Sequence, residues 1–259
     1  MIVRGVVVMS RSEREKLIYD SGSINRSSYE KIFERSIIDT EYLNRIISKS
    51  MTYAEGKEVL ELGSNAWIGY LHLKNIHPKK LYCINISKRE LNIGIQYYKN
   101  NNISFPVEFH LMDANNPSFS ESQFDFIFGG AILHHLNIEV AVKNMSHLIK
   151  PNGKILFHEP LGANPIAKII RTLTPFARTK DERPISIKDL HRIEKYFNCS
   201  NYFCGGTSTV AAMATAIVAK RTNTVVDQWA NSVDKIMSQI RIFSYFYREI
   251  IINGSKRPT

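Results

Sequence analysis

The sequence predicts an α/β protein built on a mostly parallel sheet with helices on both faces. Short apolar runs alternate with longer amphipathic segments through five units, up to residue 160. The first apolar run, Lys57–Leu62, stops abruptly at a Glu-x-Gly turn that ends in Gly63, which is typical of a buried strand. Such a turn at the carboxyl end of a parallel strand is where open α/β sheets bind nucleotides. Two later apolar runs bring the expected total to seven strands.

The first fifty residues are expected to form a helical cap. Ser12–Tyr19 and Tyr29–Ser50 carry apolar residues at helical spacing, with charged residues between them. The turn-forming stretch Asp20–Ser23 separates these two helices. We therefore expect residues 1–50 to form an N-terminal helical lid and residues 51–259 to form the main domain.

The sheet is expected to follow in regular units. Ser87 and Glu90 have capping-box spacing, which predicts a helix that runs through Tyr98. An amphipathic helix is predicted over Ile138–Ile149, and a turn at residues 151–153 should lead into the fifth strand. The five predicted strands are Lys57–Leu62, Leu81–Ile86, Val107–Met112, Phe124–Phe128 and Lys154–His158.

The regular alternation breaks after the fifth strand. Four prolines and several basic residues mark residues 160–185 as an insertion. The elements predicted beyond it are helix Ser186–Tyr196, strand Phe197–Cys204, a helix after residues 205–206, helix Val225–Ile242 and a last strand, Tyr247–Asn253.

Composition gives broad bounds on the function. The chain has 259 residues and a net charge of +10, which suits an anionic partner but equally fits cations spread over solvated faces. Three cysteines without paired spacing favour a reducing compartment. The apolar stretches Ile2–Met9 and Val210–Ala219 are too short to span a membrane. A soluble, cytoplasmic protein is therefore expected.

Five motifs in order resemble one family. They are VLELG at residues 59–63, INIS at 84–87, LMDA at 111–114, FDFIFGGAILHHL at 124–136 and LIKPNGKILFHEP at 148–160. Together they are similar to class I S-adenosylmethionine-dependent methyltransferases of the small-molecule, type 11-like kind. The resemblance covers Leu43–Pro160 well and the C-terminal part loosely. It implies a Rossmann-like sheet, S-adenosyl-L-methionine as cofactor, and methyl transfer to an oxygen, nitrogen or carbon of a small molecule.

The resemblance also implies which residues bind the cofactor. Around the amino-acid part of the cofactor it places Glu61, Gly63, Ser64 and Asn65. At the ribose and adenine it places Asn85, Ile86, Asp113 and Ala114. Near the reactive methyl it places Gly129 and Gly130, and Tyr19 belongs to the segment that forms a lid in similar proteins.

Two departures from the family pattern leave a second function open. Asn65 and Trp67 stand where the family has further glycines, and Asn85 replaces a carboxylate. Hydrogen bonds to charged partners are worth ~1.5–3 kcal/mol, so the Asn85 exchange predicts weaker cofactor binding rather than its loss. The alternative is a protein of this fold that no longer transfers methyl groups. Such a protein would act as a binding partner or catalyse another reaction, such as a cyclisation.

Three side chains are candidates for acid–base catalysis. His134 or His135 could remove a proton from the acceptor, because neutral imidazole is available near pH 7. Glu159, next to His158 at the end of the fifth strand, is the third candidate. Each also has a structural interpretation: a histidine packed at a helix start, or a glutamate that caps the following loop. No metal site is expected, because the side chains of adjacent histidines should diverge.

The remaining motifs narrow the substrate class. No GxSxG elbow or Walker lysine loop is present, and the motif of base-methylating enzymes is missing at residues 129–132. A nucleic-acid substrate is therefore unlikely despite the charge. The basic insertion, which also carries apolar residues, predicts an anionic or amphipathic small-molecule acceptor. The alternative is a covering helix whose cations are simply solvated. The sequence predicts no oligomeric state.

Overall fold

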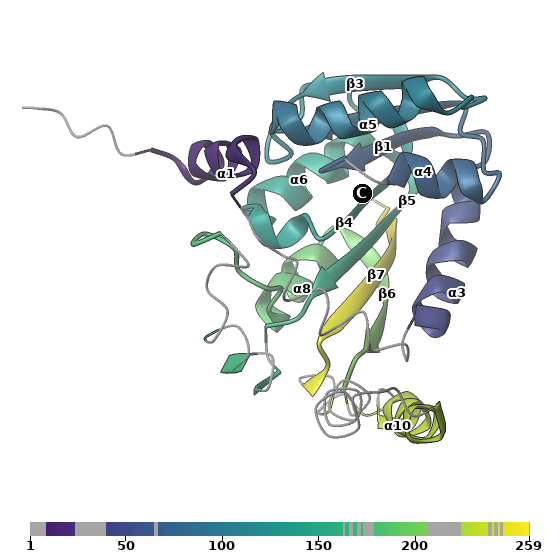
Figure 1. The fold of residues 1–259 in the computed structure, drawn as a ribbon, viewed down its shortest axis with the longest axis vertical. Helices are drawn as coiled ribbons and strands as arrows, with labels where there is room; N and C mark the ends of the chain where they lie inside the picture. Colours follow the sequence, from purple (N-terminus) through teal and green to yellow (C-terminus); the bar gives the residue numbers. More distant parts are fainter. Residues whose placement is uncertain are drawn as a thin grey trace, which may run out of the picture.

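The computed structural model describes residues 9–23, 40–64, 67–162, 164–165, 168–169, 172, 179–206, 224–237, 240, 243 and 246–258. Within these residues the strands form one sheet in the order β3-β2-β1-β4-β5-β7-β6 (Figure 1). The pairs among β1 to β5 are parallel, whereas β7 runs antiparallel to both β5 and β6. This arrangement confirms the predicted seven-stranded, mostly parallel sheet. The strands are β1 Glu58–Leu62, β2 Lys80–Asn85, β3 Val107–Leu111, β4 Phe124–Gly130, β5 Ile149–Pro160, β6 Phe197–Cys204 and β7 Glu249–Lys256.

Helices lie on both faces of the sheet (Figure 1). Buried residues of α6 and α8 share one core cluster with the sheet, and buried residues of α3 and α4 share the other. Helix α1 lies beside α5, near the edge where β1 and β2 end. The helices are α1 Arg11–Ser21, α3 Thr40–Met51, α4 Trp67–Leu73, α5 Lys88–Asn100, α6 Ile138–Leu148, α8 Ile187–Glu194 and α10 Thr224–Met237, with 3-10 turns η1 Thr52–Ala54 and η2 Leu133–His135.

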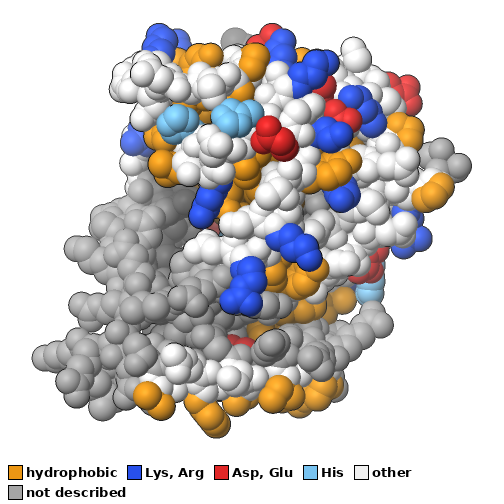
Figure 2. Space-filling view, turned by 90° about the vertical axis from the view of Figure 1, so that its right-hand side faces the viewer, with side chains coloured by type: hydrophobic (Ala, Val, Ile, Leu, Met, Phe, Trp, Pro, Cys, Tyr) orange, Lys and Arg blue, Asp and Glu red, His pale blue; other side chains and the backbone are white. Residues whose placement is uncertain are grey.

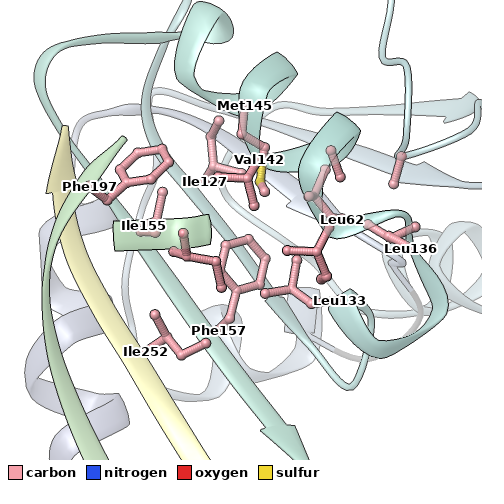
Figure 3. Packing of buried hydrophobic residues seen from close by; sticks show 14 of the residues in the cluster. Leu62, Ile127, Leu133, Leu136, Val142, Met145, Ile155, Phe157, Phe197 and Ile252 are labelled. Carbon is pink, nitrogen blue, oxygen red and sulfur yellow. The ribbon is translucent and has the colours of Figure 1, made fainter. Parts of the chain in front are cut away.

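Alternation along each strand decides which core a side chain enters. In β1, Leu60 and Leu62 pack on the α6 side, while Val59 packs on the α3 side. Figure 3 shows the α6 side, where Leu62 and Phe157 of the sheet face Val142 of α6. Because successive strand residues point to opposite faces, Glu61 shares the side of Val59.

Several boundaries differ from those predicted. Strand β5 begins at Ile149, so the expected turn at residues 151–153 is part of the strand, with a register irregularity and a positive φ of 63° at Asn152. Strand β4 continues to Gly130, because Gly129 and Gly130 still pair with β5. The last strand is shifted to Glu249–Lys256 by its pairing with β5 and β6. The predicted residues 29–39 and the helix after Gly206 lie outside the described part of the chain.

The cations do not gather into one field on the face that Figure 2 shows. Blue lysine and arginine side chains are scattered there among acidic, apolar and uncharged ones. Within the described part of the chain, no helix is long and apolar enough to cross a membrane.

Candidate functional site

A cavity of about 240 Å³ lies at the carboxyl ends of the parallel strands, beneath helix α1. Parallel strands end at the same edge of a sheet, so the loops that follow β1, β2, β3 and β4 converge there. The cavity is lined by Ser12, Glu15, Tyr19, Gly63, Asn85, Ile86, Glu90, Asp113, Ala114, Asn115, Gly130, Ala131, Ile132, His135 and Leu136.

The turn after β1 brings the backbone close to the cavity. Gly63 has a φ of +72°, which glycine adopts without strain. A Cβ added there would lie 2.8 Å from Cδ1 of Ile132, so the site needs glycine both for conformation and for space. Asn85 stabilises the same turn, because its Nδ2 donates to the Ser64 carbonyl at 3.1 Å and its Oδ1 accepts from the Ser87 amide at 2.8 Å. The Asn85 side chain is therefore fixed by its own loop.

Carboxylates give the cavity wall its charge. Glu15, Glu90 and Asp113 line the cavity, and no lysine or arginine lines it among the residues that the structure describes. Asp113 is held by Asn115, whose backbone N and Nδ2 both donate to Oδ1, at 2.8 and 2.9 Å. Glu90 is in the first turn of α5, with a side chain that is 14% exposed. An acidic wall of this kind favours a cationic ligand or one that offers hydroxyl and amino donors.

Helix α1 is fixed over the cavity by polar contacts at both ends. Near its start, the Arg11 guanidinium donates to the carbonyls of His134 and Leu136 at 2.9 and 3.0 Å. Near its end, Asp20 accepts a 2.7 Å hydrogen bond from the hydroxyl of Ser87, the N-cap residue of α5. These contacts hold α1 over the cavity.

His135 connects the lid to the cavity wall. Its Nε2 lies 3.0 Å from the Tyr19 hydroxyl, and its Nδ1 lies 3.1 Å from Oε2 of Glu15. Burial lowers the pKa of His135, and its contact with Glu15 opposes this only in part. The imidazole is therefore neutral at pH 7, with one nitrogen able to accept a proton or to bind a metal ion.

His134 and Glu159 form a buried pair behind that wall. Oε1 of Glu159 accepts from the backbone amides of Ile132 and Leu133 at 2.9 and 2.8 Å. Its Oε2 lies 2.7 Å from Nδ1 of His134. Glu159 therefore binds the backbone of the loop after β4, whereas the structural interpretation from the sequence had it cap the loop that follows Glu159 itself. Neither residue lines the cavity.

The two histidine rings are close together, which corrects the expectation that they diverge. Their ring centroids are 4.1 Å apart, although both residues lie in the short 3-10 turn η2. Nε2 of His134 also lies 3.8 Å from Oε1 of Glu182, from the insertion. The argument from spacing against a metal site is therefore wrong for this pair.

The predicted site residues fall into three groups. The cavity wall includes Tyr19, Gly63, Asn85, Ile86, Asp113, Ala114, Gly130 and His135. Outside the wall are Glu61, Ser64, Gly129, His134 and Glu159. Glu61 is fully buried, with Oε2 3.4 Å from the Cys83 sulfur. Asn65 is outside the described residues, and Trp67 packs edge-on against Tyr70 and Phe128, beside the cavity.

Sequence reasoning missed seven lining residues: Ser12, Glu15, Glu90, Asn115, Ala131, Ile132 and Leu136. Glu90 was assigned only to helix capping. Its position in the first turn of the helix that follows the second strand could have indicated a carboxylate near the cavity. Glu15 had no local signal, because its contact with the site depends on how the lid helix docks.

The residues present fit the predicted cofactor. The acidic wall suits a sulfonium cation and an ammonium group, the glycine turn admits a close ligand, and Glu90 supplies a carboxylate near Asn85. The chemistry of this donor set therefore agrees with S-adenosyl-L-methionine.

Comparisons with known proteins agree with this geometry. Residues 60–157 match a family model described as a methyltransferase domain. The O-methyltransferase cnsE of Penicillium expansum is 20% identical over 124 residues, which are 48% of this chain and 45% of that protein. The chain thus matches less than half of that relative. The comparisons confirm the predicted methyltransferase domain and support S-adenosyl-L-methionine as its cofactor.

Solved structures show the same fold. Geranyl diphosphate C-methyltransferase from Streptomyces coelicolor A3(2), in complex with Mg²⁺, geranyl diphosphate and S-adenosyl-L-homocysteine, has a TM-score of 0.59 at 9% identity and covers 84% of this chain and 79% of its own. The (4+2)-cyclase SpnF has a TM-score of 0.53 at 14% identity and covers 84% and 81%. At these identities the structural similarity shows a shared fold and nothing about activity.

Proposed function

We propose that this chain, which carries a methyltransferase domain on the class I fold, transfers a methyl group from S-adenosyl-L-methionine to a small-molecule acceptor. The observation that carries the proposal is the cavity at the strand ends, where the charged residues among the described lining are carboxylates: Glu15, Glu90 and Asp113. Among common cofactors, a sulfonium compound with a free ammonium group and ribose hydroxyls matches such a wall. When bound, this cofactor supplies an electrophilic methyl group.

Binding would divide among the loops in strand order. Gly63 admits the amino-acid part of the cofactor to the turn after β1. Glu90 accepts hydrogen bonds from the ribose hydroxyls. Asp113 accepts from the adenine amino group, and its Oδ1 is kept in position by Asn115. Glu90 thus replaces the carboxylate that Asn85 does not provide.

The acceptor would enter on the side of Gly130, Ile132 and His135. His135 is the one predicted catalytic group in the cavity wall, and Tyr19 of the lid fixes its orientation. Lid closure excludes water and aligns the acceptor, which is the main protein contribution to a displacement at carbon. Three cationic side chains of the insertion are described, and all three are exposed: Lys168, Lys180 and Arg183. Their exposure favours the interpretation that the cations of the insertion are solvated rather than placed to bind a substrate. An uncharged or cationic acceptor therefore suits the site better than an anionic one.

The test is methyl transfer itself. Purified protein is incubated with S-adenosyl-L-methionine labelled in its methyl group and with a panel of phenols, amines, carboxylic acids and terpenoid diphosphates. Label in an acceptor, together with an equal amount of S-adenosylhomocysteine, supports the proposal. No label from any acceptor by a protein that binds the cofactor contradicts methyl transfer to these classes.

A second candidate is a reaction without methyl transfer. It is favoured by Asn85, whose side chain is committed to its own loop, and by a cyclase among the structures of the same fold. In that case the cofactor would bind and remain unchanged while a substrate is converted.

A further inference from the structure

A cluster of histidines and glutamates lies where the lid, the loop after β4 and the insertion meet. His134, His135 and Glu182 each offer one ligand atom, and these three atoms lie within 4.8 Å of one another. The His134 and His135 side chains are 5% and 7% exposed, and that of Glu182 is 12% exposed. We propose that His134, His135 and Glu182 form a binding site for a divalent transition-metal ion such as Zn²⁺.

The partners of His134 prepare it as a ligand. Its Nδ1 lies 2.7 Å from Oε2 of Glu159, a carboxylate that is itself fixed by two backbone amides. A carboxylate at this nitrogen holds the proton on Nδ1 and leaves the Nε2 lone pair free. Most metal-binding histidines have such a partner, which sets the tautomer and the ring orientation. The free Nε2 is the atom that lies 3.8 Å from Glu182.

A second observation points to a missing ligand beside His135. Its Nδ1 and Oε2 of Glu15 are buried, and neither makes a hydrogen bond within the described residues. The two atoms are 3.1 Å apart, but their geometry is wrong for a hydrogen bond between them. Unsatisfied buried polar atoms are costly, and an ion bound through Nδ1 of His135 would satisfy that atom.

The donor set limits the kind of ion. Two imidazoles and one carboxylate suit Zn²⁺, Fe²⁺ or Mn²⁺, whereas Mg²⁺ prefers oxygen ligands. Ligand atoms in a tetrahedral Zn²⁺ site are about 3.3 Å apart, given metal–ligand distances of about 2.0 Å. The cluster is somewhat wider, so binding would draw Glu182 inward and pull the insertion toward the lid.

The site would face the cavity. Because His135 lines the cavity wall, an ion on its ring lies at that wall. Three protein ligands leave at least one position of a four-coordinate ion for another molecule. An oxygen or nitrogen of the methyl acceptor could occupy it, and this last statement alone rests on the proposed function.

Metal titration tests the site directly. The full chain without a histidine tag is stripped of metal and titrated by calorimetry with Zn²⁺ and, separately, with Mg²⁺. We expect one equivalent of Zn²⁺ to bind, no comparable binding of Mg²⁺, and Glu182→Gln to weaken the Zn²⁺ affinity at least tenfold. Glu108→Gln is the matched control, because it removes a carboxylate from the exposed His110–Glu108 contact and should change nothing.

Thermal melting provides an independent readout. Zn²⁺ should raise the melting temperature of the wild type and of Glu108→Gln, but not that of Glu182→Gln, whose metal-free melting temperature shows whether it folds. No stoichiometric Zn²⁺ binding by the wild type, or equal affinity in Glu182→Gln, would overturn the site. Neither result depends on S-adenosylmethionine, so failure of this proposal is distinguishable from failure of the proposed function.

Discussion

Asp20 of the lid helix accepts a 2.7 Å hydrogen bond from Ser87, and the same hydroxyl caps helix α5. This hydrogen bond, with the backbone amide of Arg89 at 3.4 Å, lowers the pKa of Asp20. A negative charge at a helix N-terminus is also favoured by the helix dipole. Asp20 therefore joins the lid to the element that carries Glu90 into the cavity.

Loss of the Asp20–Ser87 hydrogen bond should weaken the attachment of helix α1 to helix α5. We expect Asp20→Ala to weaken binding of S-adenosylhomocysteine by roughly three- to tenfold, which corresponds to about 0.7–1.4 kcal/mol, the net contribution of one hydrogen bond. Asp20→Asn, which can still accept from Ser87, should show a smaller effect. Calorimetry measures both variants, and an unchanged affinity in Asp20→Ala would contradict a closing role for α1.

Glu90 is expected to supply the ribose contact. Glu90→Gln should weaken S-adenosylhomocysteine binding by about tenfold, because a charged acceptor becomes a neutral one. Glu139→Gln is the control, since Glu139 also lies in the first turn of a helix but its side chain is 72% exposed and is not among the residues that line the cavity. Equal affinities in the two variants would remove Glu90 from the ribose site.

Gly63 should resist substitution for two separable reasons. Gly63→Ala introduces both a strained positive φ and a contact of 2.8 Å with Ile132. Gly56 has a similar φ of +65° with nothing within 4 Å of an added Cβ, so Gly56→Ala measures the strain alone. Urea unfolding should show a loss of about 1 kcal/mol for Gly56→Ala and a larger one for Gly63→Ala. Similar losses would mean that Ile132 moves aside freely.

A buried ion pair at the β5–β7 pairing predicts a dependence of stability on pH. Burial opposes the charge on both groups, yet Arg248 and His158 lower the pKa of Glu249 from 4.5 to about 2, and Glu249 raises the pKa of His158 above 6.5. The Glu249 contribution is fully present above pH 4.5 and is lost as the pH falls toward 2. The His158 contribution is fully present below pH 6.5 and is lost as the pH rises through the raised value.

Glu249→Gln tests this dependence. The difference in unfolding free energy between the wild type and the variant should be largest between pH 4.5 and 6.5 and should decline on both sides. Urea titrations at a series of pH values measure it. A difference that is as large below pH 4.5 and above pH 6.5 as it is between these values would show that the pair does not titrate as the contacts imply.

Local patterns were sufficient for most of the fold. Strand β6 was predicted to the residue, and β1 to β3 within one residue at each end, because buried apolar runs flanked by turn residues leave little choice of boundary. Strand β5 was placed too short, because Pro151, Asn152 and Gly153 indicate a turn. The strand starts earlier because Ile149 pairs with Phe124, and the next pair, Phe126 with Lys154, passes over residues 150–153.

The site was less predictable, for a physical reason. Residues that follow a strand end, such as Gly63, Asn85 and Asp113, reach the cavity because parallel topology brings strand ends together. Glu61 precedes Leu62 in the strand and therefore points to the opposite face of the sheet, where it is buried. The sequence motif does not show which face a strand residue points to. Glu15 and Glu182 come to His134 and His135 only through docking of segments more than 40 residues away in sequence.

Calorimetric titration of the purified chain with S-adenosylhomocysteine, beside its Asp113→Ala variant, tests the central claim most directly. The cavity at the strand ends predicts one bound equivalent for the wild type and an affinity at least tenfold weaker for the variant, which loses the proposed adenine contact. Absence of binding to the wild type at millimolar ligand, or equal binding by both proteins, would contradict a cofactor site in this cavity.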